Sequence, residues 1–95
     1  MKELDPLFEH RARLTIGVLL MRHTKISFAK FKEELQMTDG NLGAQLRKLE
    51  DAGYVSLKRD FVDRKPVTWY SLTAVGKEAV KNHIAALQDL INLVE

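Results

Sequence analysis

Small, amide and basic side chains are concentrated between Thr38 and Lys48, on the side of a predicted helix that lies opposite Leu42, Leu46 and Leu49. Asparagine and glutamine can bind a base edge through paired hydrogen bonds, and arginine and lysine can reach guanine or phosphate. The major groove of B-DNA, about 12 Å wide, accepts one helix whose exposed face is small or polar. We therefore predict a DNA-contacting helix whose candidate residues are Thr38, Gly40, Asn41, Gly43, Ala44, Gln45, Arg47 and Lys48.

The two glycines in this segment favour that interpretation over a purely structural one. Each glycine inside a helix costs ~0.5–1 kcal/mol relative to alanine. On a helix surface that faces only water, no interaction offsets this loss of stability. Close approach of another surface explains why glycine is present. Gly43 is more informative than Gly40, because Gly40 lies in the first turn.

A second basic group lies on a hairpin that follows this helix directly. Residues 54–59 and 67–72 alternate apolar and polar side chains, as strands do. The link from Asp60 to Pro66 is polar and charged except for Phe61 and Val62, and Pro66 marks the edge of the second strand. As a wing, the hairpin would contact the DNA backbone or minor groove. Its candidate residues are Arg59, Arg64 and Lys65, and the alternative is a solubilising charged turn.

Residue types suited to other chemistry are sparse. The chain has no cysteine, which excludes a disulfide framework, a thiolate metal site and a cysteine nucleophile. The three histidines share no helical ligand spacing, so we expect surface or dimer-interface positions for His10, His23 and His83. Ser27, Ser56 and Ser71 show no sequence pattern that pairs a nucleophilic serine with a histidine, and no glycine-rich phosphate loop is present. We expect no enzyme activity, no metal site and no cofactor.

Length and composition indicate one globular domain over residues 1–95. The content is 45% hydrophobic and 29% charged, and the net charge of +2 only weakly favours nucleic acid. The position of the charges is more informative, since residues 47–77 hold seven basic side chains against four acidic ones. The N-terminal segment lacks the features of a secretory signal, and the longest apolar stretch is too short for a membrane span. We expect a cytoplasmic protein.

Capping residues and helical periodicity predict the elements that hold these groups. Asp5 and Pro6 indicate the start of a first helix over about 6–22, with apolar side chains on two sides. Ser27 caps a second helix, which runs from Phe28 to about Gln36 and follows an extended link. Thr38 caps the third helix, and Gly53 stops it. The helix-turn-helix thus occupies about 28–52 and the wing 54–72.

Thr73 caps a last helix over about 74–94, whose apolar residues alternate steps of four and three. That spacing is typical of a helix that packs along another helix. It could be packing within one chain, but the stripe outlasts a domain core about 30 Å across. We therefore expect the first and last helices to form a homodimer interface. Its predicted residues are Leu7, Leu14, Val18, Met21, Val80, Ile84, Leu87, Ile91 and Val94.

Two segments resemble a known family. Residues 37–55 (MTDGNLGAQLRKLEDAGYV) and 61–73 (FVDRKPVTWYSLT), with Gly76, are similar to winged helix DNA-binding domains related to the MarR and ArsR repressors. The resemblance covers essentially the whole chain and implies DNA contacts from the third helix and the wing. It also implies dimerisation through the terminal helices. The chain departs from the family at Asp63, where glycine is frequent, and at Gly43 and Ala44, where serine or a larger polar residue is common.

The predicted fold is mainly α with a small antiparallel hairpin, a winged helix-turn-helix. The predicted function is sequence-specific binding of duplex DNA by a homodimer that represses transcription by occluding a promoter. The alternative is a winged-helix module that binds proteins and not DNA. A small-molecule effector would act at the dimer interface. Trp69 is out of phase with Tyr70 and Leu72 and should lie on the outer face of the hairpin. There it packs on a terminal helix, stacks on Arg59 or lines an effector pocket, and we favour packing.

Overall fold

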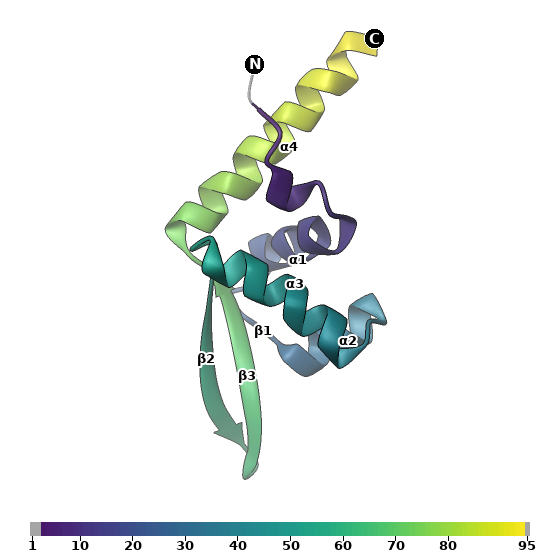
Figure 1. The fold of residues 1–95 in the computed structure, drawn as a ribbon. Helices are drawn as coiled ribbons and strands as arrows, with labels where there is room; N and C mark the ends of the chain where they lie inside the picture. Colours follow the sequence, from purple (N-terminus) through teal and green to yellow (C-terminus); the bar gives the residue numbers. More distant parts are fainter. Residues whose placement is uncertain (1–2, 95) are drawn as a thin grey trace.

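The computed structural model describes residues 3–94, so Met1, Lys2 and Glu95 of the predicted domain lie outside the described residues. Its elements follow in this order: a 3-10 helix η1 (Pro6–Phe8), α1 (Arg11–Arg22), β1 (Ile26–Ser27), α2 (Phe28–Leu35), α3 (Asp39–Asp51), β2 (Val55–Val62), β3 (Lys65–Leu72) and α4 (Ala74–Val94) (Figure 1). The predicted winged-helix architecture of helices and hairpin is confirmed. The structure adds a short strand β1 and divides the first helix.

The first helix is not continuous from residue 6 to residue 22, as predicted. Asp5 caps only the short η1, through a 3.0 Å bond from the Leu7 N–H to Oδ1. His10 then has extended backbone angles and caps α1, because its Nδ1 accepts the Ala12 N–H at 3.2 Å. The break turns Phe8 into the core, where its ring stacks on Tyr54 at a centroid distance of 5.6 Å.

The sheet has three antiparallel strands in the order β1-β3-β2. The predicted extended link at 25–27 contains a strand, in which Ile26 pairs with Tyr70. The hairpin link is shorter than the predicted Asp60–Pro66. The strands continue to Val62 and Lys65, so only Asp63 and Arg64 connect them. Pro66 accordingly lies inside β3, paired with Phe61, and not at the edge of the strand.

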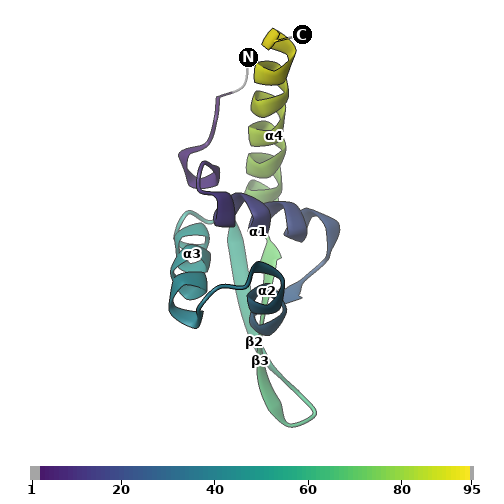
Figure 2. The same cartoon turned by 90° about the vertical axis from the view of Figure 1, so that its right-hand side faces the viewer.

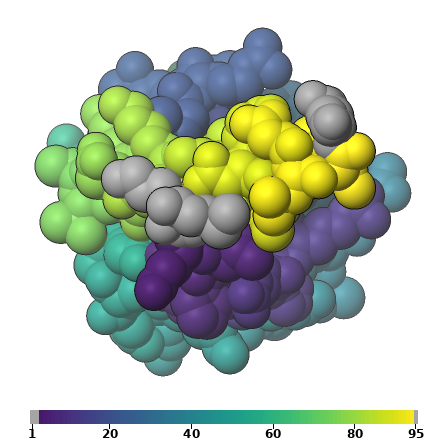
Figure 3. Space-filling model, turned by 90° about the horizontal axis from the view of Figure 1, so that it is seen from above, coloured from purple at the N-terminus to yellow at the C-terminus, as the bar shows by residue number. Residues whose placement is uncertain are grey.

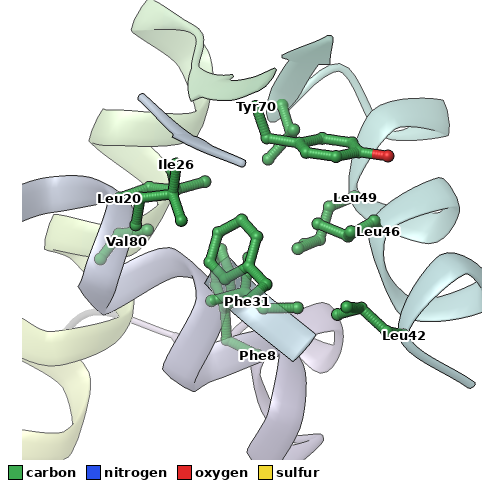
Figure 4. Packing of buried hydrophobic residues seen from close by; sticks show 11 residues of the cluster. Phe8, Leu20, Ile26, Phe31, Leu42, Leu46, Leu49, Tyr70 and Val80 are labelled. Carbon is green, nitrogen blue, oxygen red and sulfur yellow. The ribbon is translucent and has the colours of Figure 1, made fainter. Parts of the chain in front are cut away.

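The core lies where α1 crosses between α4 and the α2–α3 pair, and Figure 2 shows this crossing. The close-up in Figure 4 shows Phe31 at the centre, with Leu42, Leu46 and Leu49 of α3 on one side. Tyr70 meets Phe31 edge to face at 6.2 Å and joins the sheet to this core. The predicted apolar stripe of the third helix is therefore the stripe that is buried, which leaves the opposite side of α3 free.

Gly76 allows the start of α4 to pack closely against the loop between α3 and β2. A Cβ at Gly76 would overlap the carbonyl oxygen of Tyr54, so only glycine fits there. Thr73 caps the helix as predicted, since its Oγ1 accepts the Gly76 N–H at 3.0 Å. The same hydroxyl donates to the carbonyl oxygen of Gly53 at 2.6 Å. The loop that follows α3 is thus hydrogen-bonded directly to the residue that caps α4.

The molecule is elongated, with extents of 52 × 26 × 21 Å, and α4 and the hairpin project at opposite ends (Figure 1). Seen from above in Figure 3, the C-terminal half of α4 (yellow) is uppermost and the N-terminal segment (purple) lies beside it. Within residues 3–94, no helix combines the length and the apolar character that crossing a membrane requires.

Candidate nucleic-acid interface

One side of α3 is open and small. Thr38 caps this helix as predicted, with Oγ1 accepting the Asn41 N–H at 3.2 Å. Gly40, Asn41, Ala44, Arg47 and Lys48 are exposed, and Gly43 is half-buried. Apart from its chain neighbours and the backbone of its own helix, a Cβ added at Gly40 or Gly43 would meet no atom of the described residues within 4 Å. Packing inside the protein therefore does not require either glycine. Because glycine destabilises a helix relative to alanine, its presence here favours close approach of another molecule to this side of α3.

Gln45 does not belong to this open side, which corrects its prediction as a base-reading residue. It is 8% exposed, because its position lies three residues from Leu42 on the edge of the buried stripe. Its Oε1 accepts a 2.6 Å bond from Nη1 of Arg13, and its Nε2 donates to Oδ1 of Asn41 at 3.2 Å. Arg13 also donates through Nε to the Leu7 carbonyl oxygen at 2.6 Å. Gln45 therefore positions Asn41 from inside the protein.

A groove of about 680 Å³ separates α3 from the hairpin. It is lined by Asp39, Gly40, Gly43, Ala44, Arg47, Glu50, Leu57, Arg59 and Tyr70. Four of these lining residues were not predicted as parts of the site: Asp39, Glu50, Leu57 and Tyr70. The pairing of Leu57 with Tyr70 across β2 and β3 places both on one face of the hairpin, the face toward α3. The groove lies between the open side of α3 and strands β2 and β3 of the hairpin.

Opposite charges face each other across this groove. Burial raises the pKa of the Tyr70 hydroxyl, the charge of Glu50 raises it further, and the charge of Arg59 lowers it. Both charged groups therefore act on Tyr70 at the floor of the groove. At the start of α3, Lys32 of α2 pairs with Asp39 at 2.7 Å and offsets its negative charge. Glu50 has no such pairing among the salt bridges of residues 3–94 and is the acid that a phosphate would meet.

The wing ends in a tight turn built without glycine. Asp63 and Arg64 both have positive φ angles, 51° and 66°, the left-handed region that glycine occupies most readily. Two consecutive residues of this kind form the two-residue hairpin turn that matches strand twist. Arg59, Arg64 and Lys65 are all exposed, as a contact surface requires. Arg59 is on the face toward α3, and Lys65 is on the opposite face beside Val62.

The terminal helices supply part of the predicted dimer surface. Val80 is 2% exposed and belongs to the core of the single chain, so its prediction as an interface residue is wrong. Leu7 and Leu14 pack partly against the same core. The remaining predicted residues have exposed apolar surface, and those more than a third exposed are Val18, Met21, Ile84, Ile91 and Val94. Leu87 is half-buried.

His83 is not on the surface. It is 2% exposed, its Nδ1 accepts the Asp5 N–H at 2.9 Å, and its ring lies 5.7 Å from that of Phe8. His10 and His23 are exposed and flank α1 at its two ends. Within residues 3–94, no group of three or more histidine, aspartate or glutamate side chains could hold a metal ion.

Trp69 is half-buried on the face of the hairpin away from α3. Its ring lies 4.3 Å from the Lys25 ammonium, so the cation stacked on it is Lys25 and not Arg59. Trp69 also lines a pocket of about 420 Å³, together with Leu19 of α1 and Phe31 of α2. Of the three predicted roles of Trp69, stacking on Arg59 is therefore wrong, and packing on a terminal helix and lining an effector pocket stay predictions.

A helix pair followed at once by a two-stranded hairpin, with a groove between the second helix and that hairpin, defines a winged helix-turn-helix. The family model described as winged helix DNA-binding domain matches residues 12–91. The chain belongs to this family, as the sequence resemblance indicated, and its fold is that of MarR-like transcriptional regulators.

Individual relatives agree with this assignment. An uncharacterized protein of Methanocaldococcus jannaschii is 34% identical over 89 residues, which cover 94% of this chain and 97% of the relative. A transcriptional regulator homologue from Pyrococcus horikoshii superposes with a TM-score of 0.87 at 29% identity, covering 94% of this chain and 88% of that one. The candidate regulator ytfH from Salmonella typhimurium has a TM-score of 0.74 at 26% identity and covers 92% and 76%.

Proposed function

We propose that this protein is a sequence-specific transcriptional regulator that binds duplex DNA as a homodimer and represses by occluding a promoter. The observation that best supports this is the open side of α3, where Gly40 and Gly43 leave space that no described residue fills. In the proposed complex α3 enters the major groove with Asn41, Ala44 and Arg47 toward the bases. Arg59 and Arg64 on the wing then meet the backbone or the minor groove.

The dimer is proposed from the apolar surface of α4. The buried residues of this helix end at Ala86, yet the helix continues to Val94. Ile84, Ile91 and Val94 are 44%, 49% and 86% exposed and follow the spacing of a helix that packs along another helix. Exposed apolar surface of this extent marks an interaction site. A second copy of α4 would cover it and set two α3 helices about one DNA turn apart.

Two paired measurements test this proposal. In fluorescence anisotropy with labelled duplex DNA, Arg47→Ala should weaken binding by about 1–3 kcal/mol and relax the sequence preference at one position, as the loss of a base contact does. Lys81→Ala, which removes an exposed lysine on α4 outside the groove, is the matched control and should leave affinity unchanged. Equal affinities for the two variants would remove Arg47 from the interface.

Sedimentation analysis tests the dimer separately. Ile91→Asp places a charge in the proposed seam and should give a folded monomer, with reduced affinity for a two-fold symmetric duplex. Asn92→Asp adds the same charge at the neighbouring exposed position and should remain dimeric. A dimer that survives Ile91→Asp would contradict an interface on this face of α4.

A further inference from the structure

The wing ends in an exposed apolar side chain that its own fold does not explain. Phe61 is 72% exposed and Val62 is 46% exposed. A single exposed hydrophobic residue is ordinary, but an uncovered phenyl ring at the tip of a projecting hairpin leaves a large apolar area in water. Its cross-strand partner is Pro66, which is itself exposed, so the pair does not shield the ring.

The strand register decides which way Phe61 faces. Side chains alternate along β2, so Phe61 shares a face with Arg59 and Leu57. Leu57 and Arg59 line the groove toward α3. Val62, one residue further along, is on the opposite face. Phe61 therefore extends the groove surface outward from the protein body, whereas Val62 does not.

The position along the hairpin fits the dimensions of DNA. Phe61 pairs with Pro66, which is four residues from the groove-lining Tyr70 along β3, a distance of about 13 Å at ~3.3 Å per residue. Half a turn of B-DNA, which separates a major groove from the next minor groove, is about 17 Å. Phe61 therefore lies beyond the groove by a length on the scale of the spacing between adjoining grooves of a duplex.

The surrounding charges suit the same occupant. Arg59 precedes Phe61 on its own face, and Arg64 and Lys65 follow in the turn and the next strand. These three cations stand against two acids of the hairpin, Asp60 and Asp63, so the wing tip has a net positive charge. A positive tip with an apolar ring matches a minor groove, where apolar bases are flanked by two phosphate backbones. The turn joins two fully paired strands, so the ring is held on a rigid support.

We propose that Phe61 is an apolar wedge that enters the minor groove and partly unstacks one base step, bending the duplex. The inference rests on the proposed DNA-binding function and adds to it a second kind of sequence selectivity. Pyrimidine–purine steps such as TA unstack most easily, so the wedge favours them without any hydrogen bond to a base.

The test uses the duplex that the protein retains most tightly from a random pool, with 2-aminopurine placed at one position at a time. Wild-type protein should raise the fluorescence at a single step beneath the wing, because unstacking relieves quenching. Phe61→Ala should abolish that rise, reduce bending measured by end-to-end energy transfer, and weaken binding by about tenfold. Val62→Ala is the matched control and should change none of these.

The outcomes separate this proposal from the function it rests on. A duplex that binds tightly, shows no fluorescence rise and binds Phe61→Ala equally well would overturn the wedge while leaving DNA binding intact. Failure of the wild-type protein to retain any duplex would overturn both. Equal effects of Phe61→Ala and Val62→Ala would show that the tip acts through general apolar contact, which also contradicts insertion of Phe61.

Discussion

Arg13 of α1 donates a 2.6 Å hydrogen bond from Nη1 to Oε1 of Gln45 in α3, and Gln45 donates in turn to Asn41 at 3.2 Å. Helix α1 thus contacts α3 through a side chain that is almost fully buried. The contact explains why an amide is present at a position where the buried stripe would accept an apolar residue.

This contact predicts a difference between two substitutions of Gln45. Gln45→Leu leaves Arg13 without its acceptor and should lower the free energy of unfolding by about 1–3 kcal/mol. Gln45→Glu keeps an acceptor for Arg13, so its free energy of unfolding should be close to that of the wild type. Urea denaturation measures both. Equal stability of Gln45→Leu and the wild type would show that the Arg13 contact does not anchor α3.

Gly43 should show opposite effects on stability and on DNA binding. Alanine at this position meets open space and should stabilise the helix by ~0.5–1 kcal/mol. The added methyl group would separate α3 from the bases, so DNA affinity should fall, and Gly43→Leu should lower it further while the fold remains intact. Melting curves and anisotropy titrations give the two quantities. A stabilised variant with full affinity would mean that this side of α3 does not approach DNA.

Glu50 lines the groove and should oppose phosphate. Removing its charge with Glu50→Gln should tighten DNA binding by about two- to fivefold, the scale of one partly screened charge at a surface. Asp51 follows it in the chain but does not line the groove, so Asp51→Asn should have a smaller effect. If both substitutions tighten binding equally, net charge and not the groove governs the affinity.

The wing turn links stability and binding through Arg64. Glycine accepts the positive φ of 66° with less strain, so Arg64→Gly should stabilise the fold by up to about 1 kcal/mol. It should also weaken DNA binding, because a cation is lost. Asp63→Gly relieves a similar backbone angle but removes an acid, so it should stabilise the fold and tighten binding. If Arg64→Gly and Asp63→Gly changed the DNA affinity in the same direction and by the same factor, the proposed contact between this turn and DNA would be wrong.

Tyr54 should make the fold sensitive to high pH. Its hydroxyl donates to Oδ2 of Asp5 at 2.6 Å, and this bond, with burial and the Asp5 charge, raises the Tyr54 pKa to about 12. The unfolded chain loses the Tyr54 proton near pH 10. The protonated Tyr54 hydroxyl therefore makes its full contribution to the free energy of unfolding below pH 10, and this contribution is lost as the pH rises to 12.

The test compares wild type with Tyr54→Phe by urea unfolding between pH 9 and pH 11.5. The variant should be less stable at pH 9 and should lose stability less steeply as the pH rises. Tyr70, whose pKa is also raised, remains and preserves part of the slope. Identical slopes would show that the Asp5 bond does not persist in solution.

Sequence patterns predicted the elements wherever local signals agreed. Ser27, Thr38 and Thr73 each cap the helix expected of them, and Gly53 has the positive φ that ends α3. The core stripe of α3 was also predicted, because its leucines repeat at helical spacing. These signals involve residues only a few positions apart, so they can be recognised in the sequence without knowledge of the tertiary structure.

Features that depend on distant residues were missed. No proline or glycine marks the break at His10, and the break accompanies the packing of Phe8 on Tyr54, which lies 46 residues away in the chain. A strand of two residues such as β1 is too short to show alternation. Val80 shares the spacing of the exposed α4 stripe and is buried only because α1 crosses it, with Gly17 in close contact. Its burial could not be read from α4 alone.

The most direct test of the central claim is selection from a pool of random duplexes at about physiological salt, followed by sequencing of the retained fraction. We expect enrichment of one motif with two-fold symmetry and half-sites about one DNA turn apart. Loss of that enrichment in Arg47→Ala would attribute it to α3. A folded protein that retains no duplex above background would contradict the account and favour a winged-helix module that binds proteins.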